Sequence, residues 1–142
     1  MKISNIGIEL IKNFEGYRSD AYLCPSKVWT IGWGTTLING VKVKEGDRIT
    51  IEKANEALMV DIKKFEAVVN SRVKIILTQN KFDALVSHTY NTGGSDKLFD
   101  LINHDADDFK IRSWWVNSYI TSNGVRLNGL IKRRFDEIIN GK

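Results

Sequence analysis

The sequence predicts an α+β protein in which a small antiparallel sheet lobe and a larger helical lobe enclose a cleft. Apolar residues recur at helical spacing before residue 16 and again beyond residue 50, whereas aromatic and β-branched residues alternate at strand spacing in between. No internal repeat or linker interrupts this pattern. We therefore expect a single domain over residues 1–142, with the sheet lobe at about 17–49 and the helical lobe at about 50–142 plus an N-terminal helix over 3–15.

The first predicted element is a short amphipathic helix that ends at Glu15. Ser4 is a suitable N-cap, and Gly16 stands where a C-terminal glycine is expected. A carboxyl at the end of a helix faces the negative pole of the helix dipole, and its neighbours Phe14 and Tyr17 are apolar, so both effects favour the protonated form. A protonated glutamic acid suits general acid catalysis. The alternative is a solvated glutamate at a frayed helix end.

The next segment has the character of strands. Pro25 favours an extended backbone at Cys24, which predicts a loop over 24–27 between two strands. Asn39-Gly40 is the preferred two-residue turn of a β-hairpin. Together these features predict a three-stranded antiparallel sheet. Trp29 and Trp33 lie on one face of it, either as core residues or as rings that stack on sugars.

The helical period returns after Thr50, which is the expected N-cap of a long helix. A second helix contains Phe82 to Thr89 and closes at Asn91 to Gly94, and a short third helix contains Leu98 to Ile102. A fourth is expected over 109–119. The C-terminal helix carries an apolar stripe and, opposite it, a basic face, which is either simply solvated or attracted to an anionic polymer. The stripe is Ile131, Phe135, Ile138 and Ile139, and the face is Lys132, Arg133 and Arg134, with Arg126 and Lys142 adding charge.

Composition excludes several classes of protein. The 142 residues include 21 Lys and Arg against 17 Asp and Glu, a net charge of +4, with one cysteine and two histidines. One cysteine excludes an internal disulfide, and these few ligands form no ordinary zinc site, so we expect no metal and no cofactor. No apolar stretch reaches the roughly 20 residues of a membrane span, and Glu9 interrupts any signal-peptide core. We expect no stable membrane association and a protein made and kept in a cytoplasm.

Three segments closely resemble phage-type lysozymes, the endolysins of glycoside hydrolase family 24. The first runs from Phe14-Glu15-Gly16 through Ala21-Tyr22 to Thr30-Ile31-Gly32-Trp33-Gly34. The second contains Gln79, Ala84-Leu85, Ser87, Tyr90-Asn91 and Gly93, and the third contains Gly129-Leu130, Arg133-Arg134 and Glu137. The resemblance follows nearly the whole chain in order and implies a lysozyme-like fold.

The resemblance also implies an activity, which is hydrolysis of the β-1,4 bond between N-acetylmuramic acid and N-acetylglucosamine in peptidoglycan. The family's catalytic glutamate, its aspartate and its threonine fall on Glu15, Cys24 and Thr30. Glu15 is expected to protonate the leaving oxygen and Thr30 to orient a water, with inversion at the anomeric carbon. Tyr90 and Asn91 match a part of the family that lines the cleft, and we expect them to contact substrate. The family further implies a monomer released to the cell wall by a holin-type partner.

Two positions depart from the family pattern. Cys24 occupies the slot of the aspartate, and a thiol is mostly neutral at pH 7, which leaves open its part in activating water. Thr35 stands where the family has a histidine, a change expected to affect stability more than chemistry. His88 is expected to be packed and hydrogen-bonded, and His104 to lie in a solvated turn.

Four functions therefore stay open at this point. The first is a muramidase, and the second is a peptidoglycan-binding domain that lost turnover through the change at Cys24. The third is a nucleic-acid-binding protein, which would need clustered basic residues interleaved with stacking aromatics, so we expect no nucleic-acid partner. The fourth is a thiol hydrolase that pairs Cys24 with His88, but no local signature of such enzymes surrounds Cys24.

Overall fold

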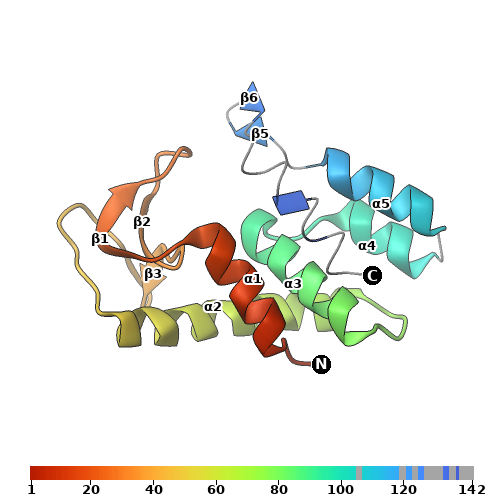
Figure 1. Ribbon diagram of the computed structural model, residues 1–142, viewed down its shortest axis with the longest axis horizontal. Coiled ribbons are helices and arrows are strands. Elements are labelled where there is room, and N and C mark those ends of the chain that lie inside the picture. The colour runs from red at the N-terminus through yellow and green to blue at the C-terminus, as the bar shows by residue number, and fades with distance from the viewer. Residues whose placement is uncertain (105–106, 119–120, 123–124, 127–132, 135–136, 138–142) are drawn as a thin grey trace.

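The computed structural model describes residues 1–104, 107–118, 121–122, 125–126, 133–134 and 137. Its helices are α1 (Asn5–Glu15), α2 (Ile51–Arg72), α3 (Gln79–Thr92), α4 (Asp96–Asn103) and α5 (Asp108–Asn117). Its strands are β1 (Arg18–Leu23), β2 (Trp29–Gly32), β3 (Leu37–Ile38), β4 (Val41–Lys42), β5 (Thr121–Ser122) and β6 (Val125–Arg126). Figure 1 shows β1, β2 and β3 gathered at one end, α4 and α5 at the other, and α2 extending along both. The predicted α+β class is confirmed.

The opening helix α1 has the predicted ends. The Ser4 side chain accepts a hydrogen bond from the Gly7 amide, and Gly16 caps the other end with a φ of 69°. The residues ahead of α1 are held by side chains of α2 and α3. The Ile3 amide donates to Glu66 at 2.7 Å and the Ser4 amide to Asp83 at 2.9 Å, and the Ser4 hydroxyl also donates to Asp83. Because these amides are satisfied, the N-terminal segment has a fixed place against the helical lobe.

The sheet lobe differs from the single three-stranded sheet that the sequence predicts. It consists of two separate two-stranded antiparallel sheets, β1–β2 and β3–β4. The chain turns sharply after β2, at Gly34 with a φ of 84°, and Thr35 pairs back onto Ile31. This turn keeps β3 from continuing alongside β2. The predicted hairpin turn is confirmed, since Asn39 and Gly40 both have positive φ, at 50° and 79°.

The helices carry the caps that the sequence predicts. The Thr50 side chain accepts a hydrogen bond from the Lys53 amide at the start of α2, and Gly93 ends α3 in the left-handed conformation with a φ of 84°. The short third helix is α4. The fourth, α5, ends at Asn117, while Tyr119 lies outside the described residues. Beyond α5 and its C-cap Ser118, the structure describes only the β5–β6 pair and three helical positions, Arg133, Arg134 and Glu137.

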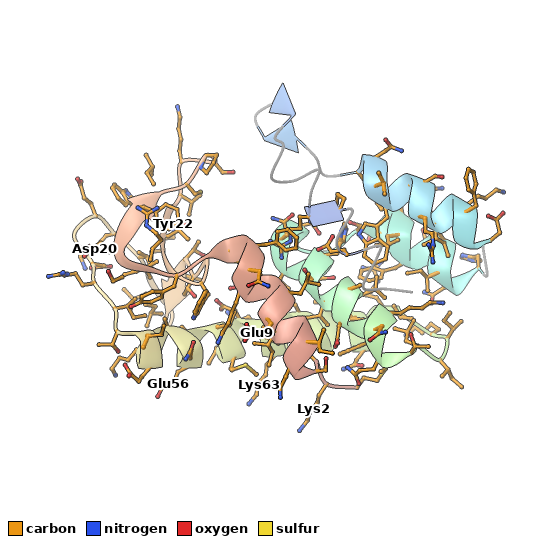
Figure 2. All side chains as sticks on the ribbon, in the orientation of Figure 1. Lys2, Glu9, Asp20, Tyr22, Glu56 and Lys63 are labelled. Carbon is orange, nitrogen blue, oxygen red and sulfur yellow. The ribbon has the colours of Figure 1, made fainter. Side chains whose placement is uncertain are left out.

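The core lies where α1, α2 and α3 meet, and it continues into α4 and α5. Fully buried side chains include Ile11 of α1, Ile62 of α2 and Phe82 of α3. Charged side chains lie on the outer surface, and Figure 2 shows Lys2, Glu9, Glu56 and Lys63 along the outer edge of the N-terminal segment, α1 and α2. None of the helices within the described part of the chain is long and apolar enough to cross a membrane.

The prediction of an exposed basic face on the C-terminal helix is wrong for Arg133 and Arg134, the two residues of that face that the structure describes. Arg133 is 3% exposed and Arg134 is fully buried, and both lie among buried polar groups of α3. A run of three basic residues is typical of a solvated face. Two of the three, Arg133 and Arg134, are buried instead because they bind acidic and polar groups, several of which lie far along the chain. Lys132, Lys142, the Arg126 side chain and the predicted apolar stripe lie outside the described residues.

Candidate active site

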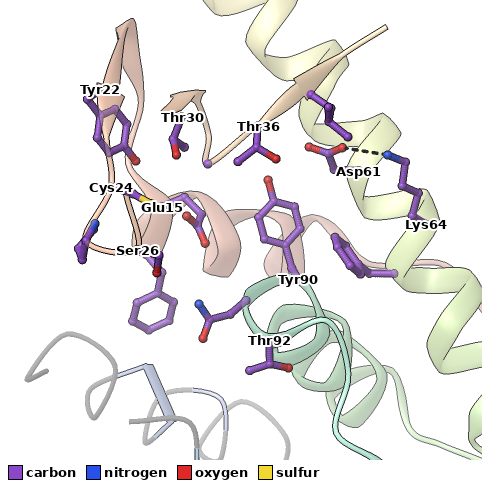
Figure 3. A pocket seen from close by; sticks show the side chains of 16 residues that line it. Glu15, Tyr22, Cys24, Ser26, Thr30, Thr36, Asp61, Lys64, Tyr90 and Thr92 are labelled. Carbon is purple, nitrogen blue, oxygen red and sulfur yellow. Dashed lines mark ion pairs between the residues drawn. The ribbon is translucent and has the colours of Figure 1, made fainter. Parts of the chain in front are cut away.

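A cleft of about 750 Å³ opens between the sheet lobe and the helical lobe (Figure 3). All five candidate residues predicted from the sequence line it, namely Glu15, Cys24, Thr30, Tyr90 and Asn91. They come from α1, from the β1–β2 segment and from the C-terminal end of α3. The remaining lining residues are Phe14, Tyr22, Pro25, Ser26, Gly34, Thr36, Leu37, Asp61, Lys64, Phe65 and Thr92.

The Glu15 carboxyl sits at the end of α1 with its side chain 19% exposed. Its Oε1 accepts a hydrogen bond of 2.7 Å from Nη1 of Arg133, and the Arg133 guanidinium lies over the Phe14 ring at 5.2 Å. The sequence indicates only the helix dipole and the apolar neighbours as influences on Glu15. It gives no sign of Arg133, because this partner lies 118 residues away within a run typical of a solvated basic face.

Arg133 is part of a buried polar network behind Glu15. Its Nη2 donates to the Ser87 carbonyl at 2.9 Å, and its Nε donates to Oε2 of Glu137 at 3.3 Å. Arg134 donates to His88 at 2.9 Å and pairs with Glu137 at 3.1 Å. Burial alone would raise the pKa of Glu137, but the hydrogen bond with His88 and the charges of the two arginines hold that pKa below its usual range. Glu137 is therefore a buried, ionised anchor for Arg133.

The two histidines have the surroundings that the sequence predicts, with His88 packed in the interior and His104 exposed to solvent. His88 is fully buried, with one ring nitrogen 2.6 Å from the Ser95 hydroxyl and the other 2.9 Å from Arg134, and burial lowers its pKa. His104 is exposed at the end of α4, with its ring 2.8 Å from the Asp100 carbonyl. With both ring nitrogens of His88 engaged away from the cleft, the structure contradicts a Cys24–His88 catalytic pair.

The sheet side of the cleft presents Cys24 and Thr30. Cys24 opens a tight turn in which its carbonyl accepts from the Lys27 amide at 2.8 Å, and its side chain is half-buried. Thr30 is buried on β2, and its hydroxyl donates to the Val28 carbonyl at 2.9 Å. A hydroxyl that donates its only proton keeps lone pairs for accepting one. Thr30 can thus accept a hydrogen bond from a water in the cleft.

Tyr90 and Asn91 are held by bonds within the protein. The Tyr90 hydroxyl donates to the Trp33 carbonyl at 2.7 Å, and burial, followed by the charges of Glu15 and Asp61, raises its pKa. Oδ1 of Asn91 accepts from Arg134 at 2.7 Å, which leaves the amide nitrogen as the donor toward the cleft. Both residues line the cleft while they also connect it to the buried network and to the sheet lobe.

Asp61 is a lining residue that the sequence reasoning missed. It lies on α2 with a side chain 17% exposed, at 3.7 Å from Nζ of Lys64, and burial raises its pKa (Figure 3). Thr35, at the family's histidine position, is fully buried, and its hydroxyl lies near Asp61 without regular hydrogen-bond geometry to any described residue. The signal in the sequence that could have found Asp61 is its position directly before Ile62, a residue of the apolar stripe of α2.

The aromatic residues left open by the sequence lie outside the cleft lining. Trp33 packs against the core, its ring lies 5.6 Å from Tyr17, and its Nε1 donates to Asn55 at 2.8 Å. This favours the core alternative for Trp33 over sugar stacking. Within the described residues, no three His, Cys, Asp or Glu side chains gather as a metal ion would need.

Comparisons with known proteins agree along almost the whole chain. Residues 12–137 match the family model described as phage lysozyme. An endolysin of Acyrthosiphon pisum secondary endosymbiont phage 1 is 36% identical over 142 residues, covering 94% of this chain and 93% of that protein. An endolysin of Bacillus phage B103 is 39% identical over 141 residues, covering 96% of this chain but 52% of that protein. The chain therefore spans about half the length of this Bacillus phage relative.

Solved structures give the same result. An endolysin from Escherichia coli O157:H7 phage FAHEc1 superposes with a TM-score of 0.83 at 38% identity, covering 99% of this chain and 92% of that one. The active form of the P1 phage endolysin Lyz gives 0.79 at 26% identity, covering 99% and 84%. Its secreted inactive form gives 0.62 at 27% identity, covering 98% and 94%. The backbone of this chain is thus nearer to the active form.

Proposed function

Because the chain belongs to the phage lysozyme family, we propose that it is an endolysin that cleaves the β-1,4 bond between N-acetylmuramic acid and N-acetylglucosamine in peptidoglycan, with Glu15 as the general acid. Membership makes the protein a lysozyme-type glycoside hydrolase, and the bond and the residues are the proposed part. The observation that carries the proposal is the Glu15 carboxyl, which lines the cleft while Arg133 holds one of its oxygens at 2.7 Å.

In the proposed reaction, Glu15 transfers its proton to the oxygen that joins the two sugars. The bond from that oxygen to the anomeric carbon breaks as positive charge develops on the sugar ring. The carboxylate that remains on Glu15 is paired with the Arg133 guanidinium. Arg133 is itself anchored to Glu137 at 3.3 Å, so it stays in place as the charge on Glu15 changes. A fixed cation stabilises the new carboxylate without reorganisation of the site.

The second half of the reaction needs a water on the other face of the sugar. We place this water beside Thr30, whose hydroxyl donates to Val28 and accepts from the water, and beside the Cys24 sulfur. The water adds to the anomeric carbon, and its proton passes to solvent. The nearness of the backbone to the active form of a related endolysin supports this arrangement of the cleft.

The biological setting is also proposed from the family. We infer that the protein acts as a monomer, that its partner is peptidoglycan rather than nucleic acid, and that it lyses the host cell. The inferred location is the host cytoplasm until a holin-type membrane partner gives it access to the wall. Its net charge of +4 suits an anionic cell wall.

The test is product analysis of purified peptidoglycan. The wild-type protein is expected to release muropeptides with reducing-end N-acetylmuramic acid, identified by mass spectrometry, and Glu15→Gln is expected to lower the rate by at least about 10²-fold, as loss of a general acid does. Anhydro-sugar products would identify a lytic transglycosylase instead. Undiminished wall degradation by Glu15→Gln would contradict the assignment of Glu15.

The second candidate is a peptidoglycan-binding domain with little turnover, which the Cys24 substitution favours. Such a protein would co-sediment with cell walls without clearing a suspension of permeabilised bacteria. The placement of both Glu15 and Thr30 on the cleft wall supports the enzyme instead, since a binding module needs no general acid. Co-sedimentation and turbidity measured on the same preparation separate the two.

A further inference from the structure

We propose that the Trp33–Gly34 turn positions the Glu15 carboxyl for proton transfer, and that Gly34 leaves the space that the second carboxyl oxygen occupies. This inference rests on the proposed role of Glu15. A Cβ atom on Gly34 would lie 2.4 Å from Oε2 of Glu15, 2.9 Å from its Cδ and 3.3 Å from its Cγ. No side chain fits between this backbone and the carboxyl. The Gly34 backbone is therefore a wall of the Glu15 site.

The two oxygens of Glu15 are held from opposite sides. Oε1 accepts a hydrogen bond from Arg133 in the helical lobe, at 2.7 Å. Oε2 faces Gly34 in the sheet lobe. A carboxyl with one oxygen bonded and the other confined has little rotational freedom about its last side-chain bond. That is the preorganisation that proton transfer to a fixed oxygen atom requires.

The turn cannot easily move away from Glu15, because both lobes hold it. The Tyr90 hydroxyl of α3 donates to the Trp33 carbonyl at 2.7 Å, and the Trp33 indole donates to Asn55 of α2 at 2.8 Å. On its other side, Thr35 and Ile31 exchange two backbone hydrogen bonds of 2.9 Å. If a side chain is added at Gly34, the least restrained group is therefore the Glu15 side chain, which must shift.

The chain offers controls with the same backbone strain. Gly34 has a φ of 84°, and Gly40 and Gly46 have φ values of 79° and 90°, where an added Cβ would meet no heavy atom within 4 Å. Alanine at any of the three is strained by the positive φ. Only at Gly34 does the added methyl also meet Glu15. The difference between Gly34→Ala and the two controls isolates the contact with the carboxyl.

The experiment compares kcat, KM and melting temperature for Gly34→Ala, Gly40→Ala and Gly46→Ala on soluble peptidoglycan fragments. We expect similar losses of melting temperature in all three and nearly unchanged kcat in the controls. For Gly34→Ala we expect kcat to fall by about 10²-fold, the scale of an ångström-sized misplacement, with KM changed by less than about threefold. A kcat for Gly34→Ala equal to that of the controls would overturn the proposal.

The double variant Gly34→Ala/Glu15→Gln tests whether the loss acts through Glu15. If it does, adding Gly34→Ala to Glu15→Gln lowers the residual rate no further, and a multiplicative loss overturns the proposal. Should Glu15→Gln be fully active, the proposed function fails. The carboxyl carbon resonance of ¹³C-labelled Glu15 then still tests the positioning, since it must shift in Gly34→Ala and not in Gly40→Ala.

A second variant covers the outcome that Gly34→Ala does not fold. Asn55→Leu removes the hydrogen bond that holds Trp33 but leaves Gly34 intact, and Asn55 is not among the lining residues of the cleft. We expect a lower kcat at unchanged KM, smaller than the effect of Gly34→Ala. An unchanged kcat in Asn55→Leu would then count against the turn as a positioning element.

Discussion

The helical side and the sheet side of the Glu15 site differ in the charge and burial of their residues. On the helical side, Arg133, Arg134, Glu137 and His88 are at most 3% exposed and bind one another through charge-assisted hydrogen bonds. On the sheet side, the cleft is lined by uncharged residues that include Tyr22 and Leu37, and Cys24 is half-buried without an ion pair among the described contacts. A charged, buried network tolerates little change because each partner compensates the others. The uncharged sheet side has no such compensation to lose, so a change at Cys24 costs less, although Gly34 is confined by its contact with Glu15.

This difference explains how a cysteine can stand where the family has an aspartate. Glu15 takes its counter-charge from the helical side, through Arg133, while Gly34 of the sheet side confines its other carboxyl oxygen. In the proposed reaction, the residues at Cys24 and Thr30 have only to place a water, and the Thr30 hydroxyl offers one acceptor for that purpose. The family's pattern is therefore retained at the buried ion pairs of Arg133 and Arg134 and varied at Cys24, while buried Thr35 is a second departure.

The largest expected effect follows removal of Arg133, which would leave Glu137 buried without one of its cations. We expect Arg133→Met to lower the free energy of unfolding by about 3–5 kcal/mol, the usual cost of breaking a buried pair. The same change frees Oε1 of Glu15, so kcat should fall as well. Urea unfolding and peptidoglycan hydrolysis measure the two effects. If Arg133→Met is as stable as wild type, the buried network is not the framework of the site.

The second effect concerns the pH dependence of stability. Because the pKa of Glu137 is depressed in the folded protein, its contribution is complete above the unfolded value of 4.5 and is lost as the pH falls below it. The lowered pKa of His88 acts in the same direction at higher pH, since His88 must be neutral when folded. Melting temperature is therefore expected to fall steeply between about pH 5 and 3 in wild type.

Glu137→Gln provides the matched control for that titration. The variant should be less stable at pH 7, because two buried arginines lose their anion, and its melting temperature should vary less between pH 5 and 3. Parallel curves for the two proteins would assign the acid transition to other carboxyl groups. Differential scanning calorimetry at several pH values makes the measurement.

A smaller effect is expected from the sheet side. Cys24→Asp restores a charged acceptor beside Thr30 and should keep or raise kcat. Cys24→Ala should lower kcat by about tenfold, less than the 10²–10⁴ that a full general base contributes. Melting temperatures should stay close to wild type in both, unlike Arg133→Met. Equal rates in all three proteins would remove Cys24 from the mechanism.

The smallest effect on stability is expected at an ion pair on the protein surface. Arg48 and Asp20 form an ion pair of 2.8 Å whose side chains are 80% and 64% exposed. Solvent screens such a pair, so Arg48→Ala should change the free energy of unfolding by less than about 0.5 kcal/mol. A loss comparable with that of Arg133→Met would mean that burial does not decide which charges matter here.

Local signals in the sequence predicted local structure well. The caps at Ser4 and Thr50 and the Asn39-Gly40 hairpin turn depend on neighbouring residues, and all three are confirmed. The five candidate site residues line one cleft because the family pattern ties each to a strand or a helix end. Their catalytic and binding roles stay predictions.

Contacts between segments that lie far apart in the chain could not be predicted from the sequence. Nothing near Arg133 indicates that it would bind Glu15, which lies 118 residues away, and a pattern of basic residues alone favours exposure. The split of the sheet into two pairs likewise depends on the turn at Gly34, which is held by α2 and α3. Such features follow from tertiary packing rather than from spacing along the chain.

The residues ahead of α1 have a practical consequence for protein engineering. Chain ends usually fray and accept tags, but here Ser4 supplies two donors to Asp83, whose side chain lies at a position only 2% exposed. Trimming the first four residues would remove both of these donors and leave the buried carboxylate with the Gln79 amide, at 2.8 Å, as its described donor. An affinity handle or fusion partner joined directly to Met1 also replaces the ammonium that donates to Asn70 at 3.0 Å. A tag is therefore better placed away from the segment ahead of α1.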